Sequence, residues 1–366
     1  MAFEVKNDVL IKYIPQEDIK EIKTEDGIAK VVITTSTVIV PDVVVEIGKK
    51  AFENCKEIEK VILPKGVKKI SSLAFKGCIK LQEVDLPNGV ECIEESAFNG
   101  CSKLSRLVLP LSVKSVGARA FKGCKSLEDI SFPIGMIEVP VSIFEDSGIK
   151  KISLPNSIKL IKERAFRGSR VEEIVLPESV ETIEVEAFYE CDRLTRINFP
   201  SSLKRIEQAA FNSCFALAKI ELPKHLEFEK CCFAGTAIES ICVSEAMTTI
   251  PACTFSACKK LKEVNIPKGV KRIEYGAFEY TESLEKIVLS EGLEEISDRA
   301  FDYCKAVYSN NGILIPKTVK RIGGLVFRIP GWAEHAGLKA KLKVYKDSYA
   351  EQYAKENGIP FEAIEE

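Results

Sequence analysis

Cysteine is the residue type in this chain whose number and spacing most invite a chemical role. Thirteen cysteines are present, and eight of them stand three residues after a phenylalanine, in a register that repeats every 22 or 23 residues: Cys55, Cys78, Cys101, Cys124, Cys191, Cys214, Cys258 and Cys304. If segments of this length stack as successive turns about 4.8 Å apart, cysteines of neighbouring turns fall within the ~4.4–6.8 Å Cα range of a disulfide. Such a column of thiols has the spacing for redox or metal chemistry.

The surrounding sequence favours a structural role for this column instead. No C-x-x-C pair is present, the only histidines are His225 and His335, and serine or threonine takes the same place at Ser147, Ser169, Thr236 and Thr281. A position that accepts all three residue types needs a small side chain, and a free cysteine behaves as a small buried apolar residue. We therefore predict thirteen reduced thiols, no metal and no cofactor. Cys242 falls at an outward strand position and is the candidate exposed thiol.

Motifs of enzyme active sites are missing from the sequence. There is no P-loop, no G-x-G-x-x-G after a strand, no H-E-x-x-H and no EF-hand loop. The two histidines are far apart in the chain, and the many carboxylates are scattered without a defensible acid–base pair. We predict that the protein is not an enzyme.

A repeat organises the whole chain. Phenylalanine recurs every 22 or 23 residues until a last interval of 26 residues, which defines about thirteen units: Phe52, Phe75, Phe98, Phe121, Phe144, Phe166, Phe188, Phe211, Phe233, Phe255, Phe278, Phe301 and Phe327. A period in this range indicates a solenoid, in which each unit is one turn, or rung, and buries its apolar face against its neighbours. The 366 residues therefore predict one continuous array rather than several globular domains.

One unit shows how the elements follow from the residues. In residues 97–116, which read A-F-x-G-C-x-x-L-x-x-L-x-L-P-x-x-V-x-x-V, the alternation up to Leu109 predicts a half-buried strand. Pro110 has no N–H and ends the hydrogen-bonded ladder. Val113 and Val116 return to the core, a short helical turn carries Ala-Phe inward, and Gly100 suits a left-handed residue that closes the turn.

The two ends of the chain depart from the repeat. A terminal rung leaves one apolar face without a neighbour and needs a cap. We predict an N-terminal cap over residues 1–30, containing a short hairpin, a solenoid over residues 31–327, and a C-terminal cap of strand, helix and strand over residues 328–366. In that last segment a strand is expected at residues 342–345, followed by a helix capped by Asp347 or Ser348 that ends near Asn357.

Composition excludes several classes of protein. The net charge of −2 gives no basic stripe for nucleic acid. The most apolar segment, residues 31–45, is interrupted by Pro41 and Asp42, so no membrane insertion is expected. No export signal is visible at the start, and the cysteines suit a reducing compartment. We expect a cytoplasmic protein; the alternative is a secreted or cell-surface protein from which a leader has been removed.

The unit A-F-x-x-C-x-x-L-x-x-I-x-L-P-x-x-V-x-x-I resembles the BspA-type leucine-rich repeat of bacteria, over roughly residues 30–327. The tail at residues 347–361 is similar to the ending of many such proteins. The resemblance implies an α/β repeat, a right-handed leucine-rich-repeat solenoid with a parallel β-sheet on its concave face and short or helical turns on its convex face. It also implies a binding protein, because several surface-displayed members of the family are associated with adhesion.

The variable positions of the strands are where a partner would be recognised. In L-x-x-I-x-L, the residues just before and just after the middle aliphatic should point away from the core. The candidate binding residues on this face are Arg106, Val108, Asp129, Lys151, Glu173, Val175, Arg196, Asn198 and Glu221. Charges alternate along the first of these columns, so stabilisation between neighbouring strands explains the same pattern without a ligand.

Aromatic residues outside the core pattern gather near the turns, at Tyr189, Phe215, Tyr275, Tyr280, Tyr303 and Tyr308. They either form a rim for protein contacts or cover the gaps between turns. Taken together, we predict a monomeric, non-catalytic scaffold for protein–protein interaction. The alternatives are an adhesin that binds host matrix or cell-surface ligands and a carbohydrate-binding module.

Overall fold

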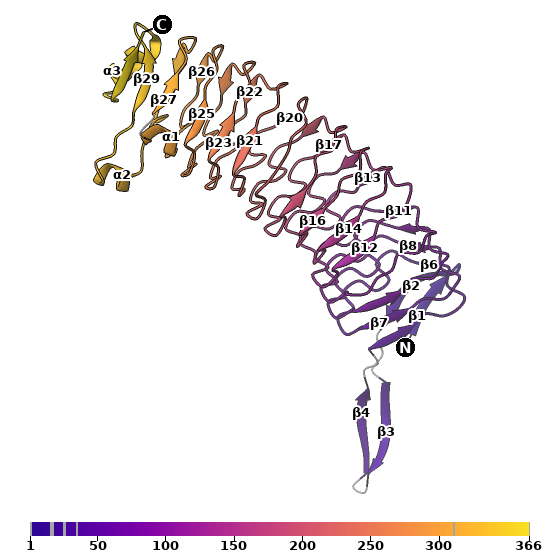
Figure 1. Cartoon of the computed structure of the whole chain (residues 1–366). Coiled ribbons are helices and arrows are strands. Elements are labelled where there is room, and N and C mark those ends of the chain that lie inside the picture. The colour runs from indigo at the N-terminus through magenta and orange to yellow at the C-terminus, as the bar shows by residue number, and fades with distance from the viewer. Residues whose placement is uncertain (1, 15–17, 25–26, 34–35, 310–311, 366) are drawn as a thin grey trace. The chain divides into compact units, whose positions relative to one another are not determined.

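The structure is a computed structural model that describes residues 2–14, 18–24, 27–33, 36–309 and 312–365 (Figure 1). The chain forms two compact units, Met1–Pro177 (unit 1) and Glu178–Glu366 (unit 2). Each unit is a stack of rungs built on parallel strands, so the predicted parallel-strand solenoid is confirmed.

The L-x-x-I-x-L-P stretch of each unit forms the first row of strands, the Leu-Pro row. In the strand Asp129–Ser131 the middle residue Ile130 is buried and its two neighbours are exposed. In the strand Ile313–Ile315 the two end residues are buried and Leu314 is exposed. In unit 1 the row comprises β5 (Thr37–Ile39), β7 (Lys60–Ile62), β9 (Glu83–Asp85), β12 (Asp129–Ser131), β14 (Lys151–Ser153) and β16 (Glu173–Ile174). In unit 2 it comprises β18 (Arg196–Ile197), β21 (Ser240–Cys242), β23 (Glu263–Asn265), β25 (Lys286–Val288), β27 (Ile313–Ile315), β29 (Leu342–Tyr345) and β30 (Phe361–Ile364).

A second row of short strands, the Val-Ile row, was not expected from the sequence. The residues of V-x-x-I do return to the core as predicted, but the last two of them also pair in parallel with the next rung, as Lys69 and Ile70 do with Cys92 and Ile93. In unit 1 the row comprises β6 (Glu46–Ile47), β8 (Lys69–Ile70), β10 (Cys92–Ile93), β11 (Ser115–Val116), β13 (Glu138–Val139) and β15 (Leu160–Ile161). In unit 2 it comprises β17 (Thr182–Ile183), β19 (Arg205–Ile206), β20 (Glu227–Phe228), β22 (Thr249–Ile250), β24 (Arg272–Ile273), β26 (Glu295–Ile296) and β28 (Arg321–Ile322).

The Ala-Phe segments are hydrogen-bonded turns rather than the helical turns that we expected. The backbone N–H of Phe75 donates to the carbonyl of Ala97 in the next rung (2.7 Å), and Phe98 repeats this bond with Ala120 (2.9 Å). Gly100 closes its turn in the left-handed region, with φ of 76°, as predicted. The turns therefore form their own ladder between rungs.

The phenylalanines of these turns form the centre of the core. In unit 1 the rings of Phe52 and Phe75 stack with centroids 4.9 Å apart, and in unit 2 those of Phe188 and Phe211 are 5.1 Å apart. The first twelve repeat phenylalanines are the largest fully buried side chains of the described residues. Offset stacking of this kind adds to the free energy gained by removing each ring from water.

Two prolines interrupt the Val-Ile row. The residue that follows each of these strands normally donates its N–H to the preceding rung, as Gly117 does to Ile93 (2.8 Å) and Glu274 to Ile250 (2.9 Å). Pro140 and Pro251 occupy this position and have no N–H to donate. In the described residues, no strand pairing joins β11 to β13 in unit 1 or β20 to β22 in unit 2.

The first described residues form a hairpin, as the sequence suggested. Strands β1 (Ala2–Lys6) and β2 (Val9–Ile14) are antiparallel, and β2 pairs in parallel with β6. The ring of Tyr13 stacks on Phe52 at 5.2 Å, so it continues the phenylalanine stack by one position. A second antiparallel hairpin follows, of β3 (Asp18–Thr24) and β4 (Gly27–Ile33).

The last residues add strands and short helices to unit 2. Helix α1 (Lys305–Tyr308) and helix α2 (Gly331–His335) are followed by β29, α3 (Tyr349–Glu356) and β30, which pairs with β29. The predicted strand at residues 342–345 and the predicted helix are both confirmed, and the hydroxyl of Ser348 caps α3 by accepting from the N–H of Glu351. The ring of Tyr353 packs edge-on against Phe327 at 6.2 Å.

Candidate functional site

The outer face of the Leu-Pro row presents every residue that the sequence nominated for binding. All nine are exposed: Arg106, Val108, Asp129, Lys151, Glu173 and Val175 in unit 1, and Arg196, Asn198 and Glu221 in unit 2. The pairing register explains why they share a face, because Asp129 lies opposite Lys151 and Ser153 lies opposite Val175. Unit 1 therefore brings six of the nine residues onto the same face of successive rungs, although Arg106 and Val175 form only single bridges and Val108 lies outside the strands.

Charged side chains on this face pair across neighbouring strands. In unit 1 the ammonium of Lys60 lies 3.1 Å from the carboxylate of Glu83, which is also 3.5 Å from the guanidinium of Arg106. The hydrogen bond to Glu83 raises the pKa of Lys60, which therefore stays protonated. These pairs support the explanation by sheet stability, and they leave most of the Arg106 side chain (78%) in contact with solvent. Exposed pairs of this kind contribute little free energy and remain available to a partner.

Unit 1 also has four strongly exposed apolar side chains in two successive rungs, and the sequence reasoning missed three of them. Val108 is 80% exposed, Leu111 96%, Ile134 80% and Ile137 62%; we call these four residues the apolar corner. Leu111 and Ile134 each follow the proline that ends a Leu-Pro stretch and are one rung apart. A signal was present, because other rungs of unit 1 have lysine or asparagine directly after this proline: Lys65, Asn88 and Asn156.

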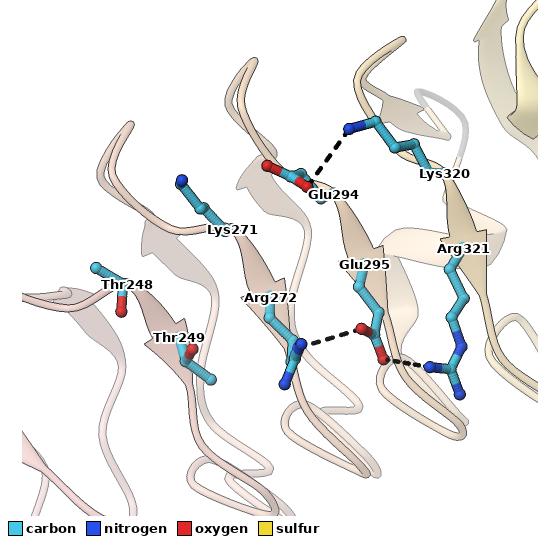
Figure 2. Close-up of a pocket in the computed structure, with 8 residues that line it drawn as sticks. All are labelled: Thr248, Thr249, Lys271, Arg272, Glu294, Glu295, Lys320 and Arg321. Carbon is cyan, nitrogen blue, oxygen red and sulfur yellow. Dashed lines mark hydrogen bonds and ion pairs between the residues drawn. The ribbon is translucent and has the colours of Figure 1, made fainter.

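The Val-Ile row of unit 2 carries a charged pocket of about 430 Å³ (Figure 2). Figure 2 shows the carboxylate of Glu295 between two guanidinium groups, 3.1 Å from that of Arg272 and 3.4 Å from that of Arg321. Lys320 pairs in the same way with Glu294 at 3.5 Å. Arg272, Lys320 and Arg321 already have carboxylate partners, and the lining lacks the apolar walls that small-molecule sites use. The pocket is better described as a ladder of ion pairs than as a ligand site.

The aromatic residues near the turns of unit 2 mostly cover the turns. The rings of Tyr280 and Tyr303 stack at 5.0 Å, and the guanidinium of Arg328 lies 4.7 Å above the ring of Tyr303. Tyr308 is buried, whereas Phe215 is 61% exposed. The stacked tyrosines and Tyr308 therefore fit the interpretation in which rings cover the gaps between turns. Phe215 remains a candidate contact residue for a protein partner.

The cysteine column combines burial with a specific hydrogen bond. In unit 1 the thiol of Cys101 donates to the carbonyl of Phe75 in the preceding rung (3.0 Å), and Cys124 repeats this with Phe98 (3.2 Å). Burial raises the pKa of the Cys124 thiol to about 12, which suppresses the reactive thiolate. The predicted burial is confirmed for these residues, and their thiols also act as hydrogen-bond donors. At the same position Thr236 donates to the carbonyl of Phe233 (2.8 Å), whereas the buried hydroxyl of Ser147 has no hydrogen-bond partner.

The remaining expectations about chemistry concern metals, disulfides and membranes. No group of three or more histidine, cysteine, aspartate or glutamate side chains among the described residues is placed to hold a metal ion. None of the thirteen cysteines, all of which lie in the described part of the chain, is in a disulfide, and Cys242 is exposed as predicted. In the part of the chain that the structure describes, every helix is too short or too polar to cross a membrane.

Comparison with protein families gives one match over most of the sequence. The model of the BspA type leucine rich repeat region (6 copies) matches residues 33–150, 138–251 and 227–329. These ranges include the phenylalanine turns and the strands of both rows as far as β28. A search of curated proteins found no significant match.

Several solved structures share the fold. A leucine-rich repeat protein from Bacteroides ovatus is 25% identical, with a TM-score of 0.71, and the match covers 96% of this chain and 99% of that one. A leucine rich cell surface protein from Faecalibacterium prausnitzii is 22% identical, with a TM-score of 0.53 and coverage of 94% and 97%. The pneumococcal vaccine antigen PcpA is 17% identical, with a TM-score of 0.52 and coverage of 99% and 95%. At these last two identities the likeness is one of fold.

Proposed function

Because the chain belongs to the BspA-type leucine-rich repeat family, we propose that it is a non-catalytic scaffold that binds a protein partner through unit 1. The partner docks on the outer face of the Leu-Pro row and on the adjoining apolar corner. Arrays of this kind offer a large rigid surface, so that little conformational entropy is lost on association.

The observation that carries the proposal is the apolar corner. Leu111 and Ile134 are among the most exposed large apolar side chains of the described residues, at 96% and 80%. Exposed apolar residues are common singly, but a cluster surrounded by charge is typical of an interaction site. Arg106, Asp129 and Lys151 stand in three successive rungs at the corresponding outward position and supply a polar rim of mixed sign. An apolar centre with a charged rim is the usual anatomy of a protein interface.

The finer architecture belongs to the same proposal. We infer a right-handed coil with the Leu-Pro row on its concave side and the phenylalanine turns on its convex side, since crossovers between parallel strands are almost always right-handed. Residues 1–30 and 328–366 would then act as the terminal caps that keep the apolar faces of the first and last rungs from water.

The test is a quantitative pull-down from the native host with wild type and surface variants. Leu111→Asp combined with Ile134→Asp removes the apolar corner, and Arg106→Glu combined with Lys151→Glu reverses the charged rim. If these residues anchor the partner, the corner variant should lower its recovery at least tenfold, which is ~1.4 kcal/mol of binding free energy. The rim variant should weaken binding less and make it more sensitive to salt.

Control variants separate the surface from general effects of mutation. Lys125→Glu changes an exposed lysine in the turn after Cys124 and should leave the partner set unchanged. Arg196→Glu tests the equivalent strand position in unit 2 by itself. Circular dichroism confirms that each variant is folded. If the folded corner variant recovers the same partners as wild type, the proposed binding surface is wrong.

The adhesin alternative is tested with the same variants. Purified chain is applied to immobilised matrix proteins and to a glycan array. Binding that survives in the corner variant would place any adhesive activity outside the proposed surface.

A further inference from the structure

Two cysteines of unit 2 form a pair that the structural column does not include. Cys231 and Cys253 each stand two residues before a repeat phenylalanine, 22 residues apart, and so occupy the same position in successive rungs. Both have left-handed backbones, with φ of 60° and 54°. The N–H of Cys231 donates to the carbonyl of Ala252, directly before Cys253, at 2.9 Å. The two residues are therefore neighbours across one rung spacing.

The surroundings of the pair differ from those of the buried column. Neither Cys231 nor Cys253 is fully buried, whereas Cys101 and Cys124 are. The buried thiols each donate to a phenylalanine carbonyl at 3.0 and 3.2 Å. The thiol of Cys253 instead lies 3.7 Å from the carbonyl of Tyr275 and is hydrogen-bonded to the thiol of Cys231. Reagents from solution can therefore reach this pair, and its two sulfurs already contact each other.

A glycine keeps space open beside Cys253. Gly276 occupies the same position in the next rung, and a Cβ atom there would lie 3.4 Å from the Sγ atom of Cys253 and 3.1 Å from a carboxylate oxygen of Glu279. Arg299 fills the position one rung further on and lies 3.6 Å from Glu279. Successive rungs therefore carry Cys231, Cys253, Gly276 and Arg299 at this position. The carboxylate of Glu279 lies next to Gly276 and is already paired with Arg299.

The two thiols differ in acidity. A hydrogen bond from Cys253 lowers the pKa of Cys231 to about 7, and the charge of Lys230 acts in the same direction. The same hydrogen bond, together with burial and the charges of Cys231 and Glu279, raises the pKa of Cys253. At neutral pH a substantial fraction of Cys231 is therefore thiolate, while Cys253 keeps its proton. A nucleophilic thiolate beside a second thiol is the arrangement found in reactive dithiols.

We propose that Cys231 and Cys253 are a thiol modification site, at which a low-molecular-weight disulfide such as oxidised glutathione closes the pair into an intramolecular disulfide. The Cys231 thiolate attacks one sulfur of the reagent, forms a mixed disulfide and releases one glutathione thiolate. Cys253 then loses its proton, attacks the Cys231 sulfur and releases the second glutathione. The two protein thiols lose two protons and two electrons in total, and the reagent is reduced to two molecules of glutathione.

The distance between rungs permits this bond. Neighbouring backbones in such a stack lie about 4.8 Å apart, and disulfides span Cα separations of about 4.4–6.8 Å. Residues in register point the same way, so closure needs a small inward movement of the two Cβ atoms. The turn is at the surface and can make this movement more easily than the buried column. The inference does not depend on the proposed binding surface, which lies in unit 1.

The experiment follows the full chain in a glutathione buffer at pH 7.5. After reduction and removal of reductant, the protein is incubated with reduced and oxidised glutathione, then denatured and alkylated. The expected result is the loss of two of the thirteen alkylatable thiols. Digestion with trypsin and a glutamate-specific protease separates residues 231–239, 240–245 and 246–259, because cleavage follows Lys230, Glu239, Glu245 and Lys259. The first and third peptides should be found cross-linked.

Matched variants identify the sulfurs. Cys231→Ser should abolish the cross-link, whereas Cys253→Ser should stop at one glutathione adduct on Cys231. Cys242→Ser removes the exposed thiol outside the pair, and this variant should form the Cys231–Cys253 disulfide as wild type does. Circular dichroism establishes that each variant is folded. The proposal is overturned if folded wild type keeps all thirteen thiols, or if the cross-link survives in Cys231→Ser and therefore joins other cysteines.

Discussion

Replacement of Asp302 by asparagine should destabilise unit 2 strongly. The Asp302 side chain is fully buried and accepts two hydrogen bonds from Arg328, from Nε at 2.8 Å and from Nη2 at 2.5 Å. Arg328 also lies over the ring of Tyr303 at 4.7 Å, so its guanidinium is held in place. An asparagine retains one acceptor oxygen, loses the charge and presents an NH₂ group to the guanidinium.

The size of the effect follows from the burial of the two partners. Removal of one partner from a buried ion pair costs about 3–5 kcal/mol, because the other charge is left without compensation. The side chain of Arg328 is 37% exposed and can regain water, so we expect Asp302→Asn to lower the free energy of unfolding by about 2–3 kcal/mol. Arg328→Met should lower it more, since it leaves a fully buried carboxylate unpaired.

The assay is urea unfolding, followed by the fluorescence of Trp332 in α2 and by circular dichroism. Glu294→Gln is the matched control, because Glu294 and Lys320 are also 26 residues apart and pair at 3.5 Å, with side chains 47% and 75% exposed. The control should change the free energy of unfolding by less than about 0.5 kcal/mol. If Asp302→Asn has no larger effect than the control, the reasoning from burial is refuted.

Two further predictions concern single side chains. Cys101→Val keeps an apolar residue in the column but removes its hydrogen bond, so it should lower the free energy of unfolding by about 1–2 kcal/mol in a urea titration; Cys101→Ser keeps a donor, and an equal or larger loss for serine would contradict this. Burial, followed by the charge of Asp302, raises the pKa of Glu279 in the folded state. Ionisation of Glu279 therefore costs folding free energy: the full cost applies above the folded pKa, and no cost applies below the unfolded pKa of ~4.3. Glu279→Gln should therefore stabilise the protein at pH 7 but not near pH ~3.5, and an advantage that is the same at both pH values would argue against the pKa shift.

The repeat itself was readable from the sequence because its constraints are local and recur. Phe98 and its counterparts are core residues in every rung, and Gly100 is left-handed as its place in the turn requires. The Val-Ile row was not foreseen, because two paired residues such as Lys69 and Ile70 are too few to produce a period-2 pattern.

The candidate surface was foreseen in part. The alternation of the Leu-Pro stretch placed Arg106 and Val108 on the outer face correctly. Leu111 and Ile134 were not predicted, because the period-2 alternation applies only to the strand and ends at the proline before them. The residue roles in binding remain predictions, since they depend on a partner.

The buried pair of Asp302 and Arg328 lay beyond sequence reasoning. Both residues stand directly after a repeat phenylalanine, at a position where the residue type varies from rung to rung and the side chain is either buried or half-buried. The pairing of Cys231 with Cys253 could have been noticed from their spacing of 22 residues. The lowered pKa of Cys231, however, depends on a hydrogen bond between the two thiols, and the sequence does not show how their side chains are oriented.

The interruptions at Pro140 and Pro251 bear on how the array loses its structure. In a stack of rungs, each interface contributes its own coupling energy, and opening spreads only where that coupling holds neighbours together. At these two interfaces the Val-Ile hydrogen bonds are missing, while turn bonds remain, such as those of Arg119 to Val141 and Cys231 to Ala252. We expect the weaker coupling there to divide each unit into cooperative blocks. A block that unfolds could then refold before the neighbouring blocks unfold. Local unfolding of one rung would therefore not spread past Pro140 or Pro251.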